Sequence, residues 1–256
     1  MERKGLVITR RTLLLLRLVE VYFAEEPETR ALSGDLVVFL QARSGGKRCM
    51  PFHTLQLDLR VDPSRLWSEF GKTTRYEIRR AELRDGFMAR ILRHPSARDI
   101  EAFARFYNRF ALDTGIARSN TAKLHALNRS SALMISRVSD SSEETMSCHA
   151  YIVTPERARL LYSATSLRTS TGSDQKAAIA RANRMLHWHD IQAVHGQGIT
   201  IYDFGGLALN GDPRLQGIDN FKRGFGGRAV LEYNCYVARS VLGRLALAYL
   251  ERRRSP

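Results

Sequence analysis

The sequence has 256 residues, of which 44% are hydrophobic, and its formal net charge at pH 7 is +14. This length fits one large domain, or one domain with a partial second lobe, and the apolar fraction excludes a disordered chain. The positive charge favours an anionic partner such as nucleic acid, coenzyme A or an anionic membrane surface, although a solvated arginine-rich surface gives the same number.

The apolar stretches are too short to span a bilayer, which takes about 20 residues. Leu13 to Leu16 is bounded by arginines, and Leu245 to Leu250 ends at Glu251. The N-terminal leucines are interrupted by Arg17, so a signal peptide is not expected. These features predict a cytoplasmic protein, with peripheral membrane contact as an open alternative.

The three cysteines are Cys49, Cys148 and Cys235, an odd number with wide spacing and no C-x-x-C pair. This pattern argues against a disulfide framework and against a structural zinc site. A reducing compartment is the simplest expectation, and no bound metal is predicted.

The N-terminal part reads as an extension with short strands, over residues 1–60. Residues 12–24 fit either a strand or a helix, whereas Val37–Gln41 and Leu55–Leu59 read as strands around a turn at Gly45 and Gly46. A second unit over residues 61–256 is expected to form one compact domain.

That unit opens with a helix that starts at Pro63 and runs to about Arg84. A strand at Phe87–Leu92, a helix capped by Ser96 with Asp99, and a short helix at Thr121–Leu127 follow.

A meander comes next, with strands at Ala132–Val138, Thr145–Val153 and Ala158–Ser166. The remaining expected elements are a long helix at Lys176–His195, a strand at Ile199–Phe204, a helical turn at Gly217–Lys222, a strand at Arg228–Val237 and a final helix at Val241–Arg253. A meander followed by a crossover helix into a new strand predicts an α/β (α+β) fold with a mixed central sheet flanked by helices.

Two glycine-rich motifs near the C-terminal end are the most specific feature. Ile201 to Gly206 reads I-Y-D-F-G-G, and Gly217 to Gly227 reads G-I-D-N-F-K-R-G-F-G-G. Together they resemble the paired signatures of Fem-type transferases of the GNAT superfamily and of their single-domain acyltransferase relatives. The stretch Arg75–Ala81, R-Y-E-I-R-R-A, is similar to a helix of the same group.

The resemblance implies a GNAT-like fold that transfers an acyl or aminoacyl group to an amine, in cell-envelope or polysaccharide metabolism. Double-domain members of this group take amino acids from aminoacyl-tRNA, whereas single-domain relatives are thought to use acyl-thioesters. Acyl-CoA and aminoacyl-tRNA therefore both stay open as co-substrates, with no bound cofactor. A non-catalytic module of the same fold, binding RNA or an anionic surface, is the alternative from another class.

The binding residues are expected around the second motif. Lys222 is a compact cation suited to phosphate, and Gly226 and Gly227 permit close backbone approach. Phe221 and Arg223 flank the lysine; a glycine-rich structural turn with a surface lysine is the competing interpretation.

A second donor contact is expected before the long helix, where Arg168, Thr171, Gly172 and Ser173 stand in place of the usual coenzyme A loop. A helix N-terminus can hold a pyrophosphate even though only one glycine is present. Arg75 and Arg79, with Lys72, form a basic helix face that would contact tRNA or a diphosphate, or is simply solvated.

Four residues are candidates for the chemistry, which needs a base for the amine and an acid for the leaving group. Asp203 and His149 are the candidate bases, and Tyr202 and Tyr162 the candidate acids. A cap for the Gly205–Gly206 turn is the competing role of Asp203. His149 and Cys148 are adjacent on a strand and face opposite sides, which disfavours a Cys–His nucleophile pair.

Overall fold

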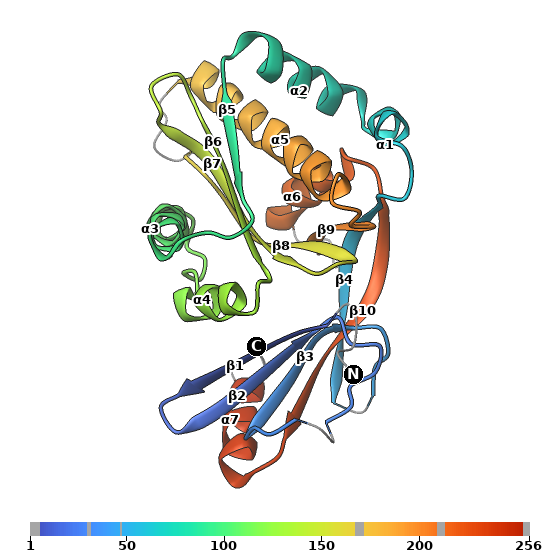
Figure 1. Ribbon diagram of the computed structural model, residues 1–256, viewed down its shortest axis with the longest axis vertical. Coiled ribbons are helices and arrows are strands. Elements are labelled where there is room, and N and C mark those ends of the chain that lie inside the picture. Colours follow the sequence, from blue (N-terminus) through green and yellow to red (C-terminus); the bar gives the residue numbers. More distant parts are fainter. Residues whose placement is uncertain (1–5, 30–31, 47, 167–171, 209–212, 253–256) are drawn as a thin grey trace. The chain divides into compact units, whose positions relative to one another are not determined.

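A computed structural model describes residues 6–29, 32–46, 48–166, 172–208 and 213–252 (Figure 1). The chain forms two compact units, one of residues 1–54 with 229–256 and the other of residues 55–228. The sequence predicts a boundary at residue 60, with residues 229–256 in the second unit. The structure groups that segment with the N-terminal part instead, because its strand pairs with an N-terminal strand.

The first unit holds one end of a ten-stranded sheet, whose strands follow the order β1-β2-β3-β10 there. The strands are β1 (Val7–Leu13), β2 (Leu16–Tyr22), β3 (Leu36–Ala42) and β10 (Arg228–Ala238). β1 and β2 form an antiparallel hairpin, β2 and β3 are parallel, and β10 is antiparallel to β3. The ambiguous residues 12–24 therefore include the end of β1, the hairpin turn and the whole of β2.

The apolar residues of β2 and β3 alternate between two faces, as the period of a strand requires. Val19, Val21, Val37 and Phe39 belong to one buried cluster. Leu18, Leu36 and Val38 belong to another, which α7 (Val241–Arg252) completes with Leu247.

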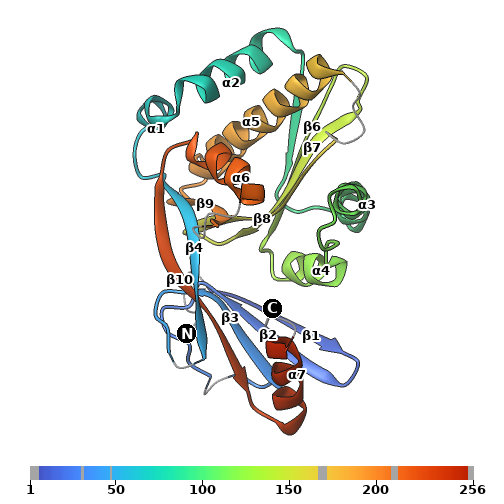
Figure 2. The same cartoon turned by 180° about the vertical axis from the view of Figure 1, so that it is seen from behind.

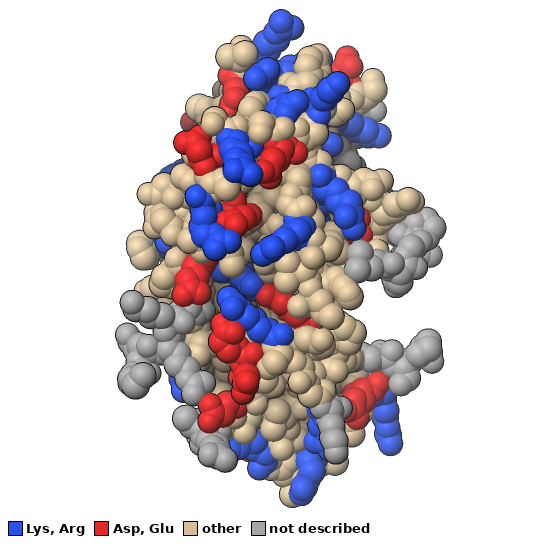
Figure 3. Space-filling view, turned by 90° about the vertical axis from the view of Figure 1, so that its right-hand side faces the viewer, with Lys and Arg blue, Asp and Glu red and all other residues tan. Residues whose placement is uncertain are grey.

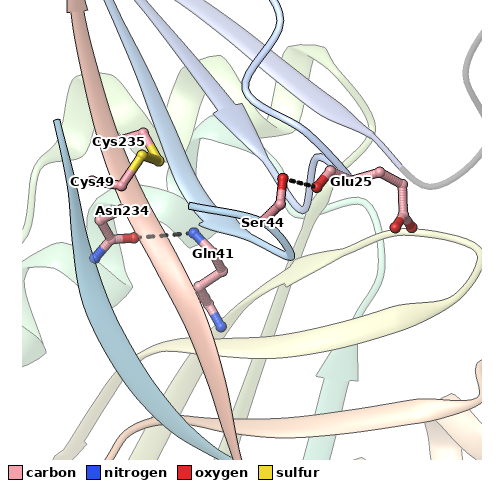
Figure 4. The surroundings of a disulfide bond; sticks show 6 residues. All are labelled: Glu25, Gln41, Ser44, Cys49, Asn234 and Cys235. Carbon is pink, nitrogen blue, oxygen red and sulfur yellow. Dashed lines mark hydrogen bonds between the residues drawn. A yellow bond between two sulfur atoms is a disulfide. The ribbon is translucent and has the colours of Figure 1, made fainter. Parts of the chain in front are cut away.

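A disulfide joins Cys49 and Cys235 within this unit, with an S–S distance of 2.02 Å (Figure 4). The expectation of no disulfide was wrong. The two cysteines are 186 residues apart in sequence, but β10 returns to the N-terminal sheet and places Cys235 beside Cys49, the first residue of β4 (Cys49–Asp58). Cys148 is buried and unpaired.

The sheet of the second unit has the order β4-β9-β8-β7-β6-β5. Its strands after β4 are β5 (Met88–Leu92), β6 (Leu133–Ser139), β7 (Thr145–Val153), β8 (Arg157–Thr165) and β9 (Ile201–Gly206). β5 to β8 pair antiparallel and β8 pairs parallel to β9, so the sheet is mixed, as predicted.

Helices cover both faces of this sheet (Figures 1 and 2). α2 (Lys72–Arg84) and α5 (Ser173–His195) lie on one face, and α3 (Ala97–Thr114) and α4 (Thr121–Arg129) on the other. The capping box of Ser96 and Asp99 at the start of α3 is confirmed. Within the described residues, no helix combines the length and hydropathy needed to cross a bilayer.

The single helix expected from Pro63 to Arg84 is two helices, α1 (Pro63–Glu69) and α2. Phe70 is extended, with ψ 141°, and the Gly71 N–H donates to the Gly224 carbonyl at 2.8 Å. The break thus comes from a contact with a distant loop, which local helix propensity does not reveal. α6 (Pro213–Arg223) is longer than the helical turn expected there.

Candidate functional site

β8 and β9 pair over only part of their length. Their parallel ladder contains three residue pairs and ends at Arg159 opposite Asp203, whereas β8 continues to Thr165. The second half of β8 therefore lies beyond this ladder. Ligands in α/β sheets gather at the carboxyl ends of strands where neighbouring strands separate, so this end of β8 and β9 is a candidate site.

β8 also has a bulge at the same point. Leu160 pairs with Tyr151 and Tyr162 pairs with Ala150, which leaves Leu161 as an extra residue in β8. A bulge bends its strand and redirects the neighbouring groups, and bulges are frequent beside active sites.

β9 bends where the ladder ends. Gly205 has φ 73°, in the left-handed region that glycine favours, and its N–H donates to Asp203 Oδ1 at 2.7 Å. The other carboxylate oxygen of Asp203 lies 3.6 Å from the Arg157 guanidinium, and Asp203 is fully buried. These contacts let Asp203 hold the bend, as the competing interpretation expects, and its catalytic role stays a prediction.

Lys222 joins the two sequence motifs directly, because its Nζ donates to the Gly206 carbonyl. Burial lowers the pKa of Lys222; the carboxylate of Asp219 raises it, and the nearby cation of Arg159 lowers it further. Asp219 in turn accepts a hydrogen bond from the Ala208 N–H at 3.0 Å. Charged groups thus gather around the end of β9.

The glycines of the second motif pack against the protein's own backbone. Gly226 and Gly227 have φ of 76° and 81°, as glycine permits. A Cβ on Gly227 would lie 2.6 Å from the Gln56 carbonyl oxygen, and one on Gly226 would lie 3.2 Å from that of Glu69. These two glycines therefore allow the α6–β10 turn to pack closely against the chain. Of the two residues that flank Lys222, Arg223 is exposed and Phe221 is half-buried.

A buried polar network lies between α5 and the sheet, centred on Asp190 of α5. Its Oδ2 accepts hydrogen bonds from Tyr151 at 2.6 Å and from Ser136 at 3.0 Å, and lies 2.8 Å from His149 Nδ1. All four residues are fully buried. Asp190 Oδ1 is also buried and has no hydrogen-bond partner among the described residues.

The network continues to a second histidine. The Tyr151 hydroxyl lies 2.7 Å from that of Tyr202, and the Tyr202 hydroxyl lies 2.7 Å from His187 Nδ1. Since Tyr151 donates its one proton to Asp190, Tyr202 must donate to Tyr151, and His187 Nδ1 must donate to Tyr202. This direction leaves the Nε2 of His187 as an acceptor.

The environment of His187 keeps the ring neutral. Burial lowers its pKa well below the usual value, and His149, Lys222 and Arg184 lower it further. The ring stacks on His149 at 4.1 Å and contacts Phe221 at 5.5 Å. The network therefore ends beneath the Phe221–Lys222 segment.

The side chains of His149, His187 and Asp190 also offer metal-ligating atoms within 4.8 Å of one another. Each already has close polar neighbours, since His149 Nε2 lies 2.9 Å from Asn183 and His187 Nδ1 lies 2.7 Å from Tyr202. The arrangement is that of a hydrogen-bonded core.

Two of the four candidate catalytic residues, His149 and Tyr202, thus belong to one network, whereas Tyr162 does not. The Tyr162 ring contacts Tyr107 of α3 at 4.8 Å, and its hydroxyl accepts from the Asn120 N–H at 3.1 Å. It therefore faces α3 and α4, on the opposite side of the sheet from His149. Cys148 faces this side too, as the alternation predicted.

The predicted donor loop is only partly described. Arg168 and Thr171 lie outside the described residues, whereas Gly172 is the N-cap of α5 and Ser173 its first residue. Because the N-cap residue is a glycine, no side chain of that residue accepts a hydrogen bond from the first turn of α5.

The basic face of α2 is partly engaged with the chain itself. Arg75 Nη1 donates to the Ser68 carbonyl at 2.7 Å, and the Arg79 guanidinium lies 5.5 Å from the centre of the Trp67 ring. Lys72 is exposed. On the face shown in Figure 3, cations and carboxylates are interspersed.

A cavity of about 240 Å³ lies between α3 and the ends of β7 and β8. Two phenylalanines give it apolar walls, and Asp113 and Glu144 place carboxylates at it; the lining residues are Phe106, Arg109, Phe110, Asp113, Glu144, Thr145, Thr165 and Ser166. Thr165 is the last residue of β8, so the cavity adjoins the strand that carries the bulge.

Asp190, His187 and Arg159 are not among the site residues predicted from the sequence. His187 and Asp190 occupy adjacent turns of α5, and their spacing of three residues, on one helix face, was a usable signal. Arg159 had no such signal, because only the parallel ladder with β9 brings it to Asp203.

No family model and no curated protein matches the sequence. Solved structures do match the fold. FemX superimposes with a TM-score of 0.59 and 14% identity, over 79% of this chain and 63% of FemX, so the chain spans less than two thirds of that protein.

The C-terminal domain of a putative lysylphosphatidylglycerol synthetase from Agrobacterium fabrum matches with a TM-score of 0.56 and 13% identity, over 95% of this chain and 84% of that one. L-PGS from Bacillus licheniformis gives 0.53 and 13%, with the same coverage. The chain has a GNAT-like, Fem-type fold. At these identities the likeness concerns the fold, which the sequence motifs had predicted.

Proposed function

We propose that this protein is a transferase that moves an acyl or aminoacyl group from an activated donor to an amine. The observation that supports this most is the end of the β8–β9 ladder beside the Leu161 bulge. Backbone N–H groups of residues 160–163 would bind the carbonyl oxygen of the donor there. Fixed N–H donors stabilise the negative charge that develops on this oxygen in the transition state.

Lys222 would hold an anionic group of the donor. It lies half-buried beside the bend of β9, with Arg159 close enough to affect its pKa. A phosphate or pyrophosphate suits such a pair of cations, and both acyl-CoA and aminoacyl-tRNA contain one.

The buried network would take up the proton of the attacking amine. The amine nitrogen bonds to the donor carbonyl carbon, and the amine proton passes to His187 Nε2. The bond to the thiol sulfur or ribose oxygen then breaks, and His187 returns the proton to this departing atom. His187 is suited to accept it because burial keeps the ring neutral and its Nδ1 donates towards Tyr202. Tyr202, Tyr151 and Asp190 orient the ring, as the carboxylate of a catalytic triad does.

The 240 Å³ cavity lies on the α3 face of the sheet, opposite to His187. The acceptor amine would therefore approach from the α5 face to give up its proton to this base.

One experiment tests both candidate donors, acyl-CoA and aminoacyl-tRNA. The purified chain would be incubated with a panel of acyl-CoAs, and separately with charged tRNAs, in the presence of amine acceptors. Products would be detected by mass spectrometry. Phosphatidylglycerol, which has hydroxyl groups and no amine, would be included as a comparison, since one matching structure is named as a domain of a putative lysylphosphatidylglycerol synthetase. An ester of phosphatidylglycerol as the only product would contradict the amine acceptor.

We expect transfer from one donor class, with the melting temperature raised by that donor, because a ligand that binds only the folded chain stabilises it. If no donor raises the melting temperature or gives product, the proposal is wrong and a non-catalytic module is favoured. Product formation abolished by ribonuclease assigns the tRNA donor.

A further inference from the structure

The turn of the β1–β2 hairpin exposes three consecutive leucines, Leu13, Leu14 and Leu15. Their exposed fractions are 44%, 98% and 83%. We call them the leucine tip. Single exposed leucines are ordinary, but a contiguous exposed apolar group marks an interaction site.

The backbone of the tip is unusual as well. Leu14 has φ 55°, in the left-handed region that glycine and asparagine normally occupy in a two-residue hairpin turn. Leucine at this position is unfavourable for the turn and exposes apolar surface to water. A fold-stabilising role explains neither feature, whereas an external partner explains both.

A second exposed apolar surface lies on the same unit. Val241, Leu245 and Tyr249 of α7 are 63%, 65% and 56% exposed, and their spacing of four residues puts them in one stripe. The opposite side of α7 packs against the sheet in a cluster that includes Leu16, the residue that follows the leucine tip.

Cations flank both surfaces. Arg10 is exposed on β1, and the Arg17 side chain is 68% exposed although it pairs with Asp35 at 3.2 Å. Arg244 and Arg252 are exposed on α7, where Glu251 is the exposed carboxylate of the last turn. Arginines beside apolar side chains complement the anionic headgroups and acyl chains of a membrane surface.

We propose that the leucine tip and the exposed stripe of α7 bind the surface of an anionic bilayer. A hairpin turn projects from its sheet, so its side chains can enter the headgroup region without a complementary concave partner. The flanking arginines would meet the lipid phosphates. This inference does not depend on the transferase activity.

The test is co-sedimentation of the full chain with vesicles of phosphatidylcholine alone, or with vesicles that contain about 30% phosphatidylglycerol. The variant Leu14→Asn with Leu15→Ser replaces the apolar surface by residues that suit the turn, so it should fold. We expect its partition coefficient on anionic vesicles to fall at least about tenfold.

A matched control changes two exposed leucines of the other unit, Leu83→Gln with Leu112→Gln, which are 81% and 71% exposed. This variant should bind vesicles like the unchanged chain. In addition, Leu14→Trp should show a blue-shifted emission when anionic vesicles are added.

Three results would overturn the proposal. The first is no sedimentation of the unchanged chain with anionic vesicles. The second is equal binding to neutral and anionic vesicles, and the third is undiminished binding of the double tip variant. Self-association that the tip variant abolishes, without vesicle binding, would assign the tip to a second copy of this chain.

Discussion

Lys222 is the residue at which the two sequence motifs meet, since its ammonium group bonds to Gly206 while lying next to Arg159 and Asp219. The carboxylates of Asp219 and Asp203 also act on Lys222, so the cluster holds charges of both signs. The proposal is that Lys222 and Arg159 together bind an anionic group of the donor, with the bond to Gly206 fixing the position of the ammonium group.

Replacing Lys222 by methionine tests this role. Lys222→Met keeps the apolar stem and removes the charge, and a charged hydrogen bond is worth roughly 1.5–3 kcal/mol. We expect kcat/KM for the donor to fall about 10- to 150-fold, at 1.4 kcal/mol per factor of ten. Arg98→Gln, which removes an exposed cation of α3, is the control and should change kcat/KM little. If Lys222→Met loses stability but keeps full activity, the lysine is only a brace.

His187 gives the protein a predictable response to acid. Burial lowers its pKa, so below about pH 6.5 the unfolded chain binds a proton that the folded chain does not. The stability that depends on a neutral His187 is complete above this pH and is lost as the pH falls, by about 1.4 kcal/mol per unit.

The variant His187→Gln removes this titration. It should be less stable than the unchanged chain at pH 7.5, but the difference should shrink by roughly 2 kcal/mol at pH 5. Urea unfolding at several pH values measures it. Two stability curves that stay parallel from pH 7.5 to 5 would show that His187 is not the titrating group.

At the scale of elements, the glycines of the second motif determine how the α6–β10 turn packs. Gly227 combines φ 81° with a Cβ position 2.6 Å from the Gln56 carbonyl oxygen. A side-chain movement cannot relieve the strain of the positive φ. It cannot relieve the short contact of the Cβ either, because the carbonyl oxygen of Gln56 belongs to the backbone of β4.

Gly227→Ala should therefore destabilise the second unit by about 2–5 kcal/mol, the sum of left-handed strain and overpacking. Gly217→Ala is the matched control, since a Cβ there meets nothing within 4 Å and alanine favours the helix α6. Urea unfolding of both variants gives the comparison. Equal stabilities would mean that the turn can move away from Gln56.

Local patterns predicted the elements well, and tertiary contacts account for the differences. Alternation identified the meander, and the capping box located the start of α3. The break between α1 and α2 was not predicted, because the hydrogen bond from Gly71 to Gly224 joins segments that are distant in sequence. The buried network was not predicted for the same reason, since Asp190 contacts His149 only when α5 packs on β7. The tyrosines and histidines were visible in the sequence, but their grouping was not.

At the scale of the whole molecule, the chain starts and ends in the same unit. β10 and α7 return to the unit that contains β1, β2 and β3, and the Cys49–Cys235 disulfide links β10 to the first residue of β4. The first unit therefore forms only when chain segments separated by the entire second unit meet. Closing so long a loop is entropically costly for an unlinked chain.

The disulfide should therefore stabilise the first unit selectively. Cys49→Ser with Cys235→Ser, or reduction of the unchanged chain, should lower the free energy of unfolding of this unit by about 2–4 kcal/mol. Hydrogen exchange measures the effect by region: amides of β10 and α7 should exchange faster, whereas those of α5 and β7 should not. Uniform acceleration across both units would contradict the selective effect.

The redox state of Cys49 and Cys235 in the cell tests whether the protein resides in a reducing or an oxidising compartment. The wide spacing of the cysteines suggested reduced thiols, but a geometry that brings Cys49 and Cys235 together allows a bond that persists only in an oxidising environment. Protein isolated from its native source under thiol-blocking conditions and then unfolded should label at Cys148 alone if the bond forms there. Labelling of all three cysteines would mean that the pair stays reduced in the cell. In that case, the stability of the first unit must come from its packed sheet and from α7, and the double serine variant would match the unchanged chain in a reducing buffer.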